Sequence, residues 1–327
     1  MLCGVGGYVP ASAVTNADQA EKFDTSDEWI RTRTGIRRRY LVERGEATSD
    51  IAVAAGAAAL KSAGVDSVDL VVLATTTPDH PCPATAPAVA ARLGLGQVAA
   101  FDLSAVCSGF VYGLATVAGF ITGGLAERVL LIGADTFSTI LDPADRGAAA
   151  VFGDGAGAVV LRRGAADEPG GLRAFDLGSD GDLTDVIMVR AGGSRYPLAD
   201  GPVTGEHRFT MQGRAVYRHA VRRMAGSARA VLDRAGWAVG EVDLFVGHQA
   251  NRRILDAVGA ELGVPAERVF VNVDRVGNTV AASIPLALGD AAAAGVLETG
   301  RKVVLTAFGG GVTWGSAALT WPSLSMS

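Results

Sequence analysis

The chain has 327 residues, of which 49% are hydrophobic and 19% are charged, and its formal net charge is −5. This length and composition suit one large globular domain or two ordinary ones, each with a buried core. The acidic balance and the lack of a Lys/Arg run argue against a nucleic-acid partner. No apolar segment is long and polar-free enough to predict a membrane span.

Cysteine usage and the first residues predict a cytoplasmic protein. Cys3, Cys82 and Cys107 are an odd number at unrelated spacings, which fits neither a disulfide framework nor a zinc site. The segment Met1–Pro10 lacks the basic start and the apolar run of a secretory signal. No group of His, Cys, Asp and Glu has metal-ligand spacing, so we expect no metal.

Strand-like and helical segments alternate along the chain, which predicts an α/β fold. The strands expected in the first part are Leu2–Tyr8, Val68–Thr75, Val98–Leu103, Val129–Gly133 and Ala158–Arg162. The expected helices are Thr25–Ile30, Ser49–Ala63, Ala84–Leu93 and Phe110–Leu125. Gly64 should end the second helix, and a glycine-rich turn at 153–157 should precede the last strand.

The second part of the chain repeats this pattern. It follows an irregular segment, Gly164–Gly205, which we interpret as the connection between two halves plus an inserted loop. The repeated segments are Val242–Val246, Phe270–Asn278, Thr279–Ala294 and Val303–Ala307. Three landmark pairs share an offset of about 171–174 residues: Val68 and Val242, Cys107 and Asn278, Val129 and Val303. The sequence therefore predicts a duplicated α/β unit with halves 1–170 and 171–327, in which Cys107 and Asn278 occupy equivalent turns.

Cys107 is the first candidate functional residue, because it lies between a strand end and a helix start. Backbone N–H groups and the positive end of the helix dipole favour a thiolate at such a position. Ser108 and Gly109 are small enough for the sharp turn that exposes a nucleophile. The alternative interpretation is a buried structural cysteine, since free cysteines are among the most buried residues.

Two further polar residues follow expected core strands. His248 comes directly after Val242–Val246, at the sheet edge where ligands of open α/β folds collect. Asn278 lies in the turn that we pair with Cys107. Alone, the first could be a structural histidine and the second a helix N-cap. Together with Cys107 they supply a nucleophile and two groups that can stabilise a developing oxyanion. The run Gly309–Gly311 could add backbone N–H groups to the same site, or it could be a plain turn.

The chain resembles the β-ketoacyl-acyl-carrier-protein synthase III family, condensing enzymes of the thiolase-fold superfamily. The resemblance rests on TSDEWIRTRTGI, CSGF, DPADRG, FGDGAGA, GHQAN, GNTVAAS and FGGGVTWGSA, which occur in this order over nearly the whole chain. Only Gly164–Glu206 matches weakly. The resemblance implies a thiolase-like fold of helices layered with two mixed five-stranded-type sheets (αβαβα), and a homodimer.

The resemblance also implies a two-step reaction that starts fatty-acid or polyketide synthesis. Cys107 would attack an acyl-CoA thioester, and CoA would leave. His248 and Asn278 would then stabilise the enolate formed when malonyl-acyl carrier protein loses CO₂, and this enolate would attack the acyl-cysteine. The backbone N–H groups of Cys107 and Gly310 would form the oxyanion hole. Asn278 argues against a thiolase, which needs a second cysteine, and against elongating synthases, which carry histidine there.

Family knowledge further suggests where CoA binds, as a substrate of an enzyme that needs no cofactor. Trp29 and Arg146 would sandwich the adenine, a role that suits their planar groups. Arg33 would meet the nucleotide phosphates, and Asn251 the pantetheine. For each residue the alternative is an ordinary structural place: a core aromatic, or arginines on a solvated surface.

The resemblance also implies a pocket for the acyl chain. The expected pocket residues are Thr76, Cys82, Phe152, Met211 and Tyr217. Cys82 stands where the family often carries phenylalanine, lent across the dimer interface, so we hypothesise a roomier pocket for longer or branched primers; Cys82 could equally be a packed filler.

A basic helix face is expected to contact the acidic carrier protein. The arginines spaced four apart are Arg214, Arg218 and Arg222, and Arg252 and Arg253 follow the GHQAN motif. We expect Arg218 and Arg253 to make the contact, although a solvated helix face would show the same pattern. Arg214 departs from the family, which usually carries asparagine there, and this puts one CoA contact in question.

Other functions stay open at this level. An acyltransferase of the same fold would move the acyl group from Cys107 to a hydroxyl or amine without decarboxylation, but the presence of both His248 and Asn278 disfavours it. A papain-like cysteine hydrolase also uses Cys, His and Asn, but the duplicated pattern argues against it. A non-catalytic binding scaffold would not need these three polar residues at strand ends.

Overall fold

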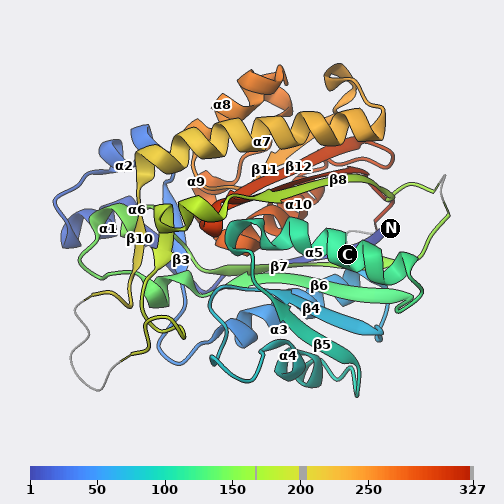
Figure 1. Ribbon diagram of the computed structural model, residues 1–327, viewed down its shortest axis with the longest axis horizontal. Helices are drawn as coiled ribbons and strands as arrows, with labels where there is room; N and C mark the ends of the chain where they lie inside the picture. Colours follow the sequence, from blue (N-terminus) through green and yellow to red (C-terminus); the bar gives the residue numbers. More distant parts are fainter. Residues whose placement is uncertain (166–167, 199–204, 325–327) are drawn as a thin grey trace.

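The computed structural model describes residues 1–165, 168–198 and 205–324. Helices and sheets alternate in five layers, with two helices between two sheets and further helices on the outer face of each sheet (Figure 1). The inner helices are α5 (Gly109–Thr122) and α10 (Ser283–Ala293). The outer helices are α3 (Thr48–Ala63) and α4 (Ala86–Arg92) on one side and α7 (Gly213–Ala235) and α8 (Arg252–Leu262) on the other. The predicted αβαβα layering is confirmed.

The first sheet has five strands in the order β1-β7-β6-β4-β5. Their bounds are Leu2–Tyr8, Gly155–Arg162, Arg128–Asp135, Leu70–Ala74 and Ala99–Leu103, in that order. Side chains alternate along the central strands: Val72 faces the inner helices, whereas Val71 and Leu73 face α3 and α4. Both faces of the sheet are therefore buried, which explains the unbroken apolar runs of the sequence.

The second sheet has four strands among the described residues, in the order β11-β12-β13-β8, rather than the five expected. Their bounds are Leu244–Gly247, Lys302–Gly309, Thr313–Thr320 and Leu172–Ser179. The expected strand at Phe270–Asn278 is reduced to one bridge beside Phe245, followed by the short helix α9 (Val273–Val276). The physical reason is Gln249, whose Oε1 accepts from the N–H groups of Asn272 and Val273 at 2.9 and 3.2 Å, so these donors cannot serve a strand ladder.

Two other expectations were wrong. The segment Gly164–Gly205 is not wholly irregular, because its described part holds β8 and β9 (Ile187–Val189); residues 166–167 and 199–204 lie outside the described residues. The glycine-rich stretch 153–157 is not a turn before a strand, since β7 begins at Gly155. A Cβ at Gly157 would lie 2.7 Å from the backbone nitrogen of Leu286, so glycine is required there for close packing on α10.

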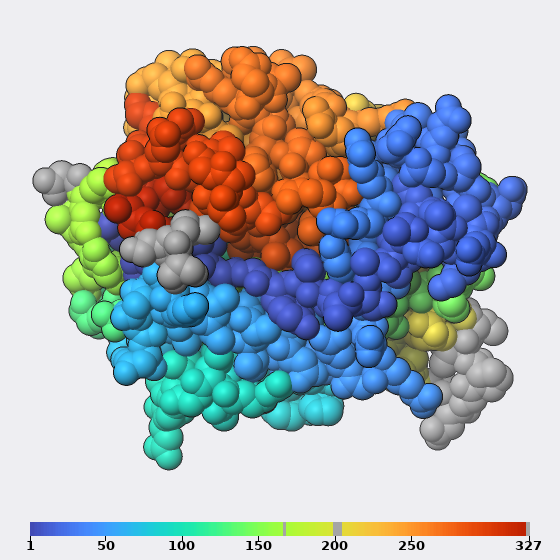
Figure 2. Space-filling view, turned by 180° about the vertical axis from the view of Figure 1, so that it is seen from behind, coloured from blue at the N-terminus to red at the C-terminus, as the bar shows by residue number. Residues whose placement is uncertain are grey.

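The smaller elements surround the entrance side of the site described below. They are β2 (Ser12–Thr15), α1 (Asn16–Lys22), α2 (Asp27–Thr34), β3 (Arg38–Leu41), α6 (Arg146–Val151) and β10 (Phe209–Met211). From behind, the blue-to-teal first part and the orange-to-red last part occupy opposite sides of the molecule, and the blue N-terminal segment reaches up beside the orange part (Figure 2). That reach brings α2 against α8.

The two sheets share a strand order, as a duplicated unit would give. β1, β7, β6 and β4 correspond in order to β8, β13, β12 and β11. The valines with positive φ, Val106 (49°) and Val280 (52°), keep the offset that relates Val129 to Val303. By this alignment the counterpart of Cys107 is Ala281, and the predicted equivalence of Cys107 with Asn278 is shifted by three residues.

A prediction concerns the close contact of β7 with α10. Gly157→Ala should lower the free energy of unfolding by about 1–3 kcal/mol, because the added methyl must displace backbone of the inner helix. Gly119→Ala, in α5 with nothing within 4 Å of the new methyl, is the matched control and should be neutral or stabilising. Urea unfolding of both variants is the measurement, and equal effects of the two substitutions would contradict this packing.

Candidate active site

Cys107 lies in a 3₁₀ turn, Val106–Ser108, between the end of β5 and the start of α5. The turn is fitted closely against the end of β12: a Cβ at Gly309 would come within 2.8 Å of the Cys107 backbone nitrogen. The position predicted from the sequence, between a strand end and a helix start, is confirmed. Gly309, which leaves room for this turn, lies in a strand about two hundred residues later in the chain.

Three turns around the site hold a valine in the left-handed region. Val106, Val280 and Val312 have φ values of 49°, 52° and 47°. They lie next to Cys107, two residues after Asn278 and two residues after Gly310, respectively. This conformation is costly for a β-branched residue, and such strain gathers at functional sites, where surrounding structure holds it in place.

The environment of Cys107 favours the protonated thiol. Burial raises the pKa of the Cys107 thiol, and the negative charge of Asp135 raises it further. This reverses the expectation that its place before α5 yields a resting thiolate. Burial likewise raises the pKa of Asp135, to about 7, although this carboxylate accepts hydrogen bonds from Thr76 N–H and Ala281 N–H.

His248 follows β11, as predicted, and is held at both ends. Its backbone N–H donates to Thr306 O at 2.8 Å, and its Nδ1 lies 2.6 Å from Ser283 Oγ. The side chain is 3% exposed, and burial lowers its pKa to about 3. The imidazole is therefore neutral at physiological pH.

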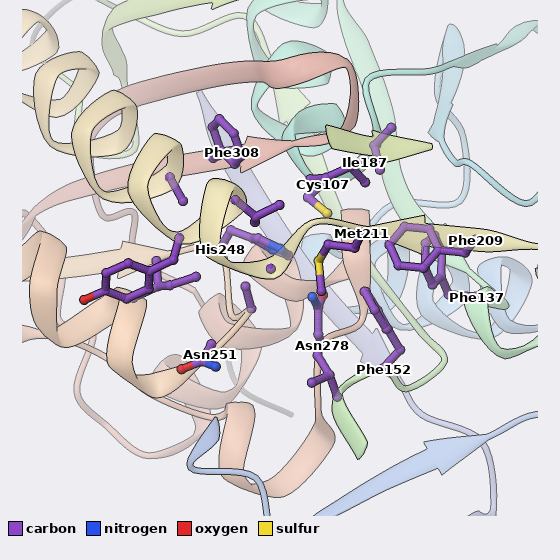
Figure 3. A pocket seen from close by; sticks show the side chains of 18 of the residues that line it. Cys107, Phe137, Phe152, Ile187, Phe209, Met211, His248, Asn251, Asn278 and Phe308 are labelled. Carbon is purple, nitrogen blue, oxygen red and sulfur yellow. The ribbon is translucent and has the colours of Figure 1, made fainter. Parts of the chain in front are cut away.

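Asn278 is oriented by its own turn. Its backbone N–H donates to Val151 O at 2.9 Å, and its side-chain Oδ1 accepts from Val280 N–H at 3.0 Å. Because the oxygen is occupied, the amide NH₂ is the group left to face the cavity. In Figure 3 the sulfur of Cys107, the ring of His248 and the amide of Asn278 point into the same space.

That space is a cavity of about 180 Å³. All three proposed catalytic residues line it. Four of the residues predicted to contact the substrate also line it: Phe152, Met211, Tyr217 and Asn251. Thr76 and Cys82 are absent from the lining: the first lies two residues beyond the end of β4, and the second is exposed in a single chain. The predicted Gly310 lies in the turn after β12, against Val106.

The sequence did not reveal the aromatic wall that closes one side of this cavity. We use this name for Phe137, Phe152 and Phe209, whose ring centroids lie 4.7–5.1 Å apart. All three are buried and line the cavity (Figure 3). They come from a 3₁₀ turn, the end of α6 and β10, so no spacing along the chain connects them. A cluster of this kind is visible only after folding.

Of the residues predicted to bind CoA, Asn251 lines the cavity, and the other three are connected to it. The guanidinium groups of Arg33 and Arg146 lie over the ring of Trp29 on α2, at 4.5 and 4.9 Å from the ring centroid. Asn251 Nδ2 donates to Arg33 O at 3.1 Å, which connects the cavity lining to this group. The four predicted residues thus form one continuous track from the cavity to the surface.

Arg218 and Arg253 lie exposed on α7 and α8, two helices that pack together. Arg214 and Arg222 are exposed on the same helix as Arg218, and Arg252 is paired with Asp256 at 2.7 Å. Tyr217, which lines the cavity, lies on the same helix. These arginines are thus exposed on helices of which one also lines the cavity, and their role as a carrier-protein surface stays a prediction.

Comparison with known proteins identifies the family. Models of 3-oxoacyl-[acyl-carrier-protein] synthase III and of its C-terminal part match residues 101–181 and 232–321. β-Ketoacyl-[acyl-carrier-protein] synthase III 5 of Streptomyces coelicolor is 59% identical over 326 residues, covering 99% of this chain and 98% of the relative. The chain belongs to the β-ketoacyl-acyl-carrier-protein synthase III family.

Solved structures agree with this assignment to the synthase III family. 3-Oxoacyl-(acyl carrier protein) synthase III of Pseudomonas aeruginosa PAO1 superposes with a TM-score of 0.93 at 52% identity, covering 99% of this chain and 98% of that one. The priming β-ketosynthase of the R1128 polyketide pathway gives 0.92 at 35% identity, with 98% and 96% covered. Within the described ranges we find neither a cluster of metal-ligating side chains nor a helix of the length and apolarity needed to cross a membrane.

A prediction follows from the lowered pKa of His248. Between about pH 6.5 and 3 the unfolded chain binds a proton that the folded chain does not, so the folded state loses stability as the pH falls. Relative to His248→Gln, the wild-type free energy of unfolding should fall by on the order of 1.4 kcal/mol per pH unit in this window.

Urea titrations of both proteins between pH 5 and 7 measure this slope. Asp135, whose raised pKa gives stability that is lost as the pH rises toward about 7, acts in the opposite direction. Because Asp135 is present in both proteins, its effect cancels in the difference. A difference that does not change with pH would show that His248 is not held neutral by burial.

Proposed function

We propose that this protein condenses an acyl-CoA primer with malonyl-acyl carrier protein through an acyl-Cys107 intermediate, the reaction of its family that initiates fatty-acid or polyketide synthesis. The observation that carries the assignment of roles is the orientation of Asn278. Its oxygen is occupied by Val280 N–H, so its NH₂ faces the cavity together with the neutral ring of His248 and the thiol of Cys107.

The first half-reaction transfers the acyl group to Cys107. Sγ attacks the thioester carbonyl, the carbon–sulfur bond to CoA breaks, and the thiol proton leaves with the CoA sulfur. We assign the stabilisation of the oxyanion to the backbone N–H groups of Cys107 and Gly310, whose turns contact each other. Because burial raises the pKa of the Cys107 thiol, the thiol loses its proton only as the new carbon–sulfur bond forms.

The second half-reaction forms the new carbon–carbon bond. The malonyl thioester loses CO₂, and the electron pair of the broken bond enters an enolate whose oxygen accepts hydrogen bonds from His248 and Asn278. The enolate carbon attacks the acyl carbonyl, and Cys107 leaves as a thiolate that takes up a proton from solvent. Two neutral donors stabilise the enolate without holding the substrate carboxylate in place. The reaction balances without a cofactor.

The CoA track and the basic surface complete the proposal. Adenine would lie between Trp29 and Arg146, which now stack on each other, so Arg146 must move away from the ring to admit it. Arg33 and Asn251 would hold the phosphates and pantetheine. Arg218 and Arg253 would receive the acidic carrier protein beside the cavity, where electrostatic attraction speeds encounter.

The primer is bounded by the aromatic wall within one chain. We propose that the wall limits the chain length that Cys107 accepts, because the cavity ends on buried rings there. Cys82 is exposed and does not line the cavity of its own chain, and we keep the prediction that a homodimer partner would bring it to the pocket.

Intact mass spectrometry of Cys107→Ala and Asn278→Ala separates the roles. With acyl-CoA alone, the first variant should show no adduct, whereas the second should acylate at a near-normal rate. With malonyl-acyl carrier protein added, Asn278→Ala should lose condensation by roughly a hundredfold or more, since one oxyanion donor is worth about that factor.

The same experiment distinguishes the alternatives. A wild-type adduct on Cys107 that passes to a hydroxyl or amine acceptor without CO₂ release would indicate plain acyl transfer. Equal loss of acylation in both variants would contradict the division of roles. An adduct that hydrolyses with no acceptor present would favour a hydrolase.

A further prediction tests the aromatic wall. Phe209→Leu should raise the ratio of kcat/KM for octanoyl-CoA over acetyl-CoA by about tenfold, because a smaller side chain leaves room for additional methylenes. Phe245→Leu removes another buried ring, one that does not line the cavity, and is the matched control. A ratio that changes equally in both variants would show that the wall does not set chain length.

A further inference from the structure

Ser283 is the first residue of α10 and lies behind His248, on the side away from the cavity lining. Its side chain is 1% exposed, and its Oγ lies 2.6 Å from His248 Nδ1. The backbone N–H of Gln249 also approaches this oxygen, at 3.4 Å. We propose that Ser283 is a positioning residue that fixes His248 in the tautomer with its proton on Nε2, facing the cavity.

The numbers of protons and lone pairs on the two groups decide the tautomer. A hydroxyl has one proton to donate and two lone pairs to accept with, and a neutral imidazole carries one proton on one of its two nitrogens. Among the described residues, Ser283 Oγ has two polar neighbours, His248 Nδ1 and the N–H of Gln249. The N–H can only donate, so Nδ1 is the acceptor for the hydroxyl proton.

The opposite tautomer would leave a buried donor without an acceptor. If Nδ1 carried the proton, Ser283 Oγ would receive two donors, and its own proton would have no partner in a place closed to solvent. An unsatisfied buried polar group costs about 1–3 kcal/mol, which is enough to decide between two tautomers of similar intrinsic energy. The proton of His248 therefore stays on Nε2.

This assignment rests on the proposed function for its consequence. An enolate oxygen needs donors, and only the Nε2–H tautomer makes His248 a donor toward the cavity. The segment 278–283 then determines both hydrogen-bond donors. Asn278 supplies its own NH₂ group, and Ser283 fixes the tautomer in which His248 donates from Nε2. The segment is held in place by Ala281 N–H, which donates to Asp135 Oδ2 at 3.0 Å.

The direct test is ¹⁵N NMR of histidine-labelled protein, in which nitrogen shifts report the tautomer of a neutral ring. Comparison with His248→Gln assigns the signals of His248 among the four histidines of the chain. The wild type should show a protonated Nε2 and an unprotonated Nδ1. A protonated Nδ1 in the wild type would overturn the proposal.

Ser283→Ala should convert the ring to a mixture of tautomers and lower condensation by roughly ten- to a hundredfold, with acylation of Cys107 unchanged within about twofold. Ser283→Thr keeps the hydroxyl and should restore the wild-type tautomer. The matched control is Thr279→Val, which removes another buried hydroxyl of the same segment, one without a hydrogen-bond partner.

Equal loss of condensation in Ser283→Ala and Thr279→Val would reduce Ser283 to a packing role. Failure of the proposed function is a separate outcome: if the wild type forms no acyl-Cys107 adduct, the chemistry is wrong, while the tautomer seen by NMR still decides the role of Ser283.

Discussion

The contact between the end of β6 and the segment before α10 is the constraint on which the site depends. Asp135 accepts from Thr76 N–H on one oxygen and from Ala281 N–H on the other, so a single buried carboxylate connects the first sheet to the segment that carries Asn278. Gly133 makes the approach possible, because a Cβ there would lie 2.5 Å from Ala281 O. A fully buried carboxylate is costly unless its oxygens are hydrogen-bonded, and here the donors come from both halves of the chain.

Burial gives the site its chemical character. The low-polarity cavity keeps His248 neutral, so that it can act as a hydrogen-bond donor rather than as a cation. The same burial raises the pKa of the Cys107 thiol, which places the cost of ionisation in the step where the acyl bond forms. A cationic histidine would bind a malonyl carboxylate and oppose its loss, whereas a neutral pair of donors favours the enolate alone.

Sequence patterns predicted the architecture well wherever burial is two-sided and local. The apolar runs of β4 and β6, the αL glycine that ends α3 and the nucleophile turn at Cys107 all agree with the structure. Two of the errors share one cause. At Phe270–Asn278 the side chain of Gln249 takes the N–H groups that a fifth strand would use, and at Gly157 the glycine serves contact with a helix far along the chain. Neither partner is visible in the local pattern.

The sequence by itself determined the side chains to which we assign the chemistry, because Cys107, His248 and Asn278 each stand at a recognisable strand or helix boundary, in motifs that resemble one family. Only the tertiary structure decided their state and their surroundings. It placed the thiol in the cavity, buried the imidazole, turned the amide of Asn278 toward the cavity, set Ser283 behind His248, and closed the cavity with three rings from separate segments. The physical reason is that protonation, tautomer and cavity shape depend on neighbours brought together in space, whereas sequence patterns report on neighbours along the chain.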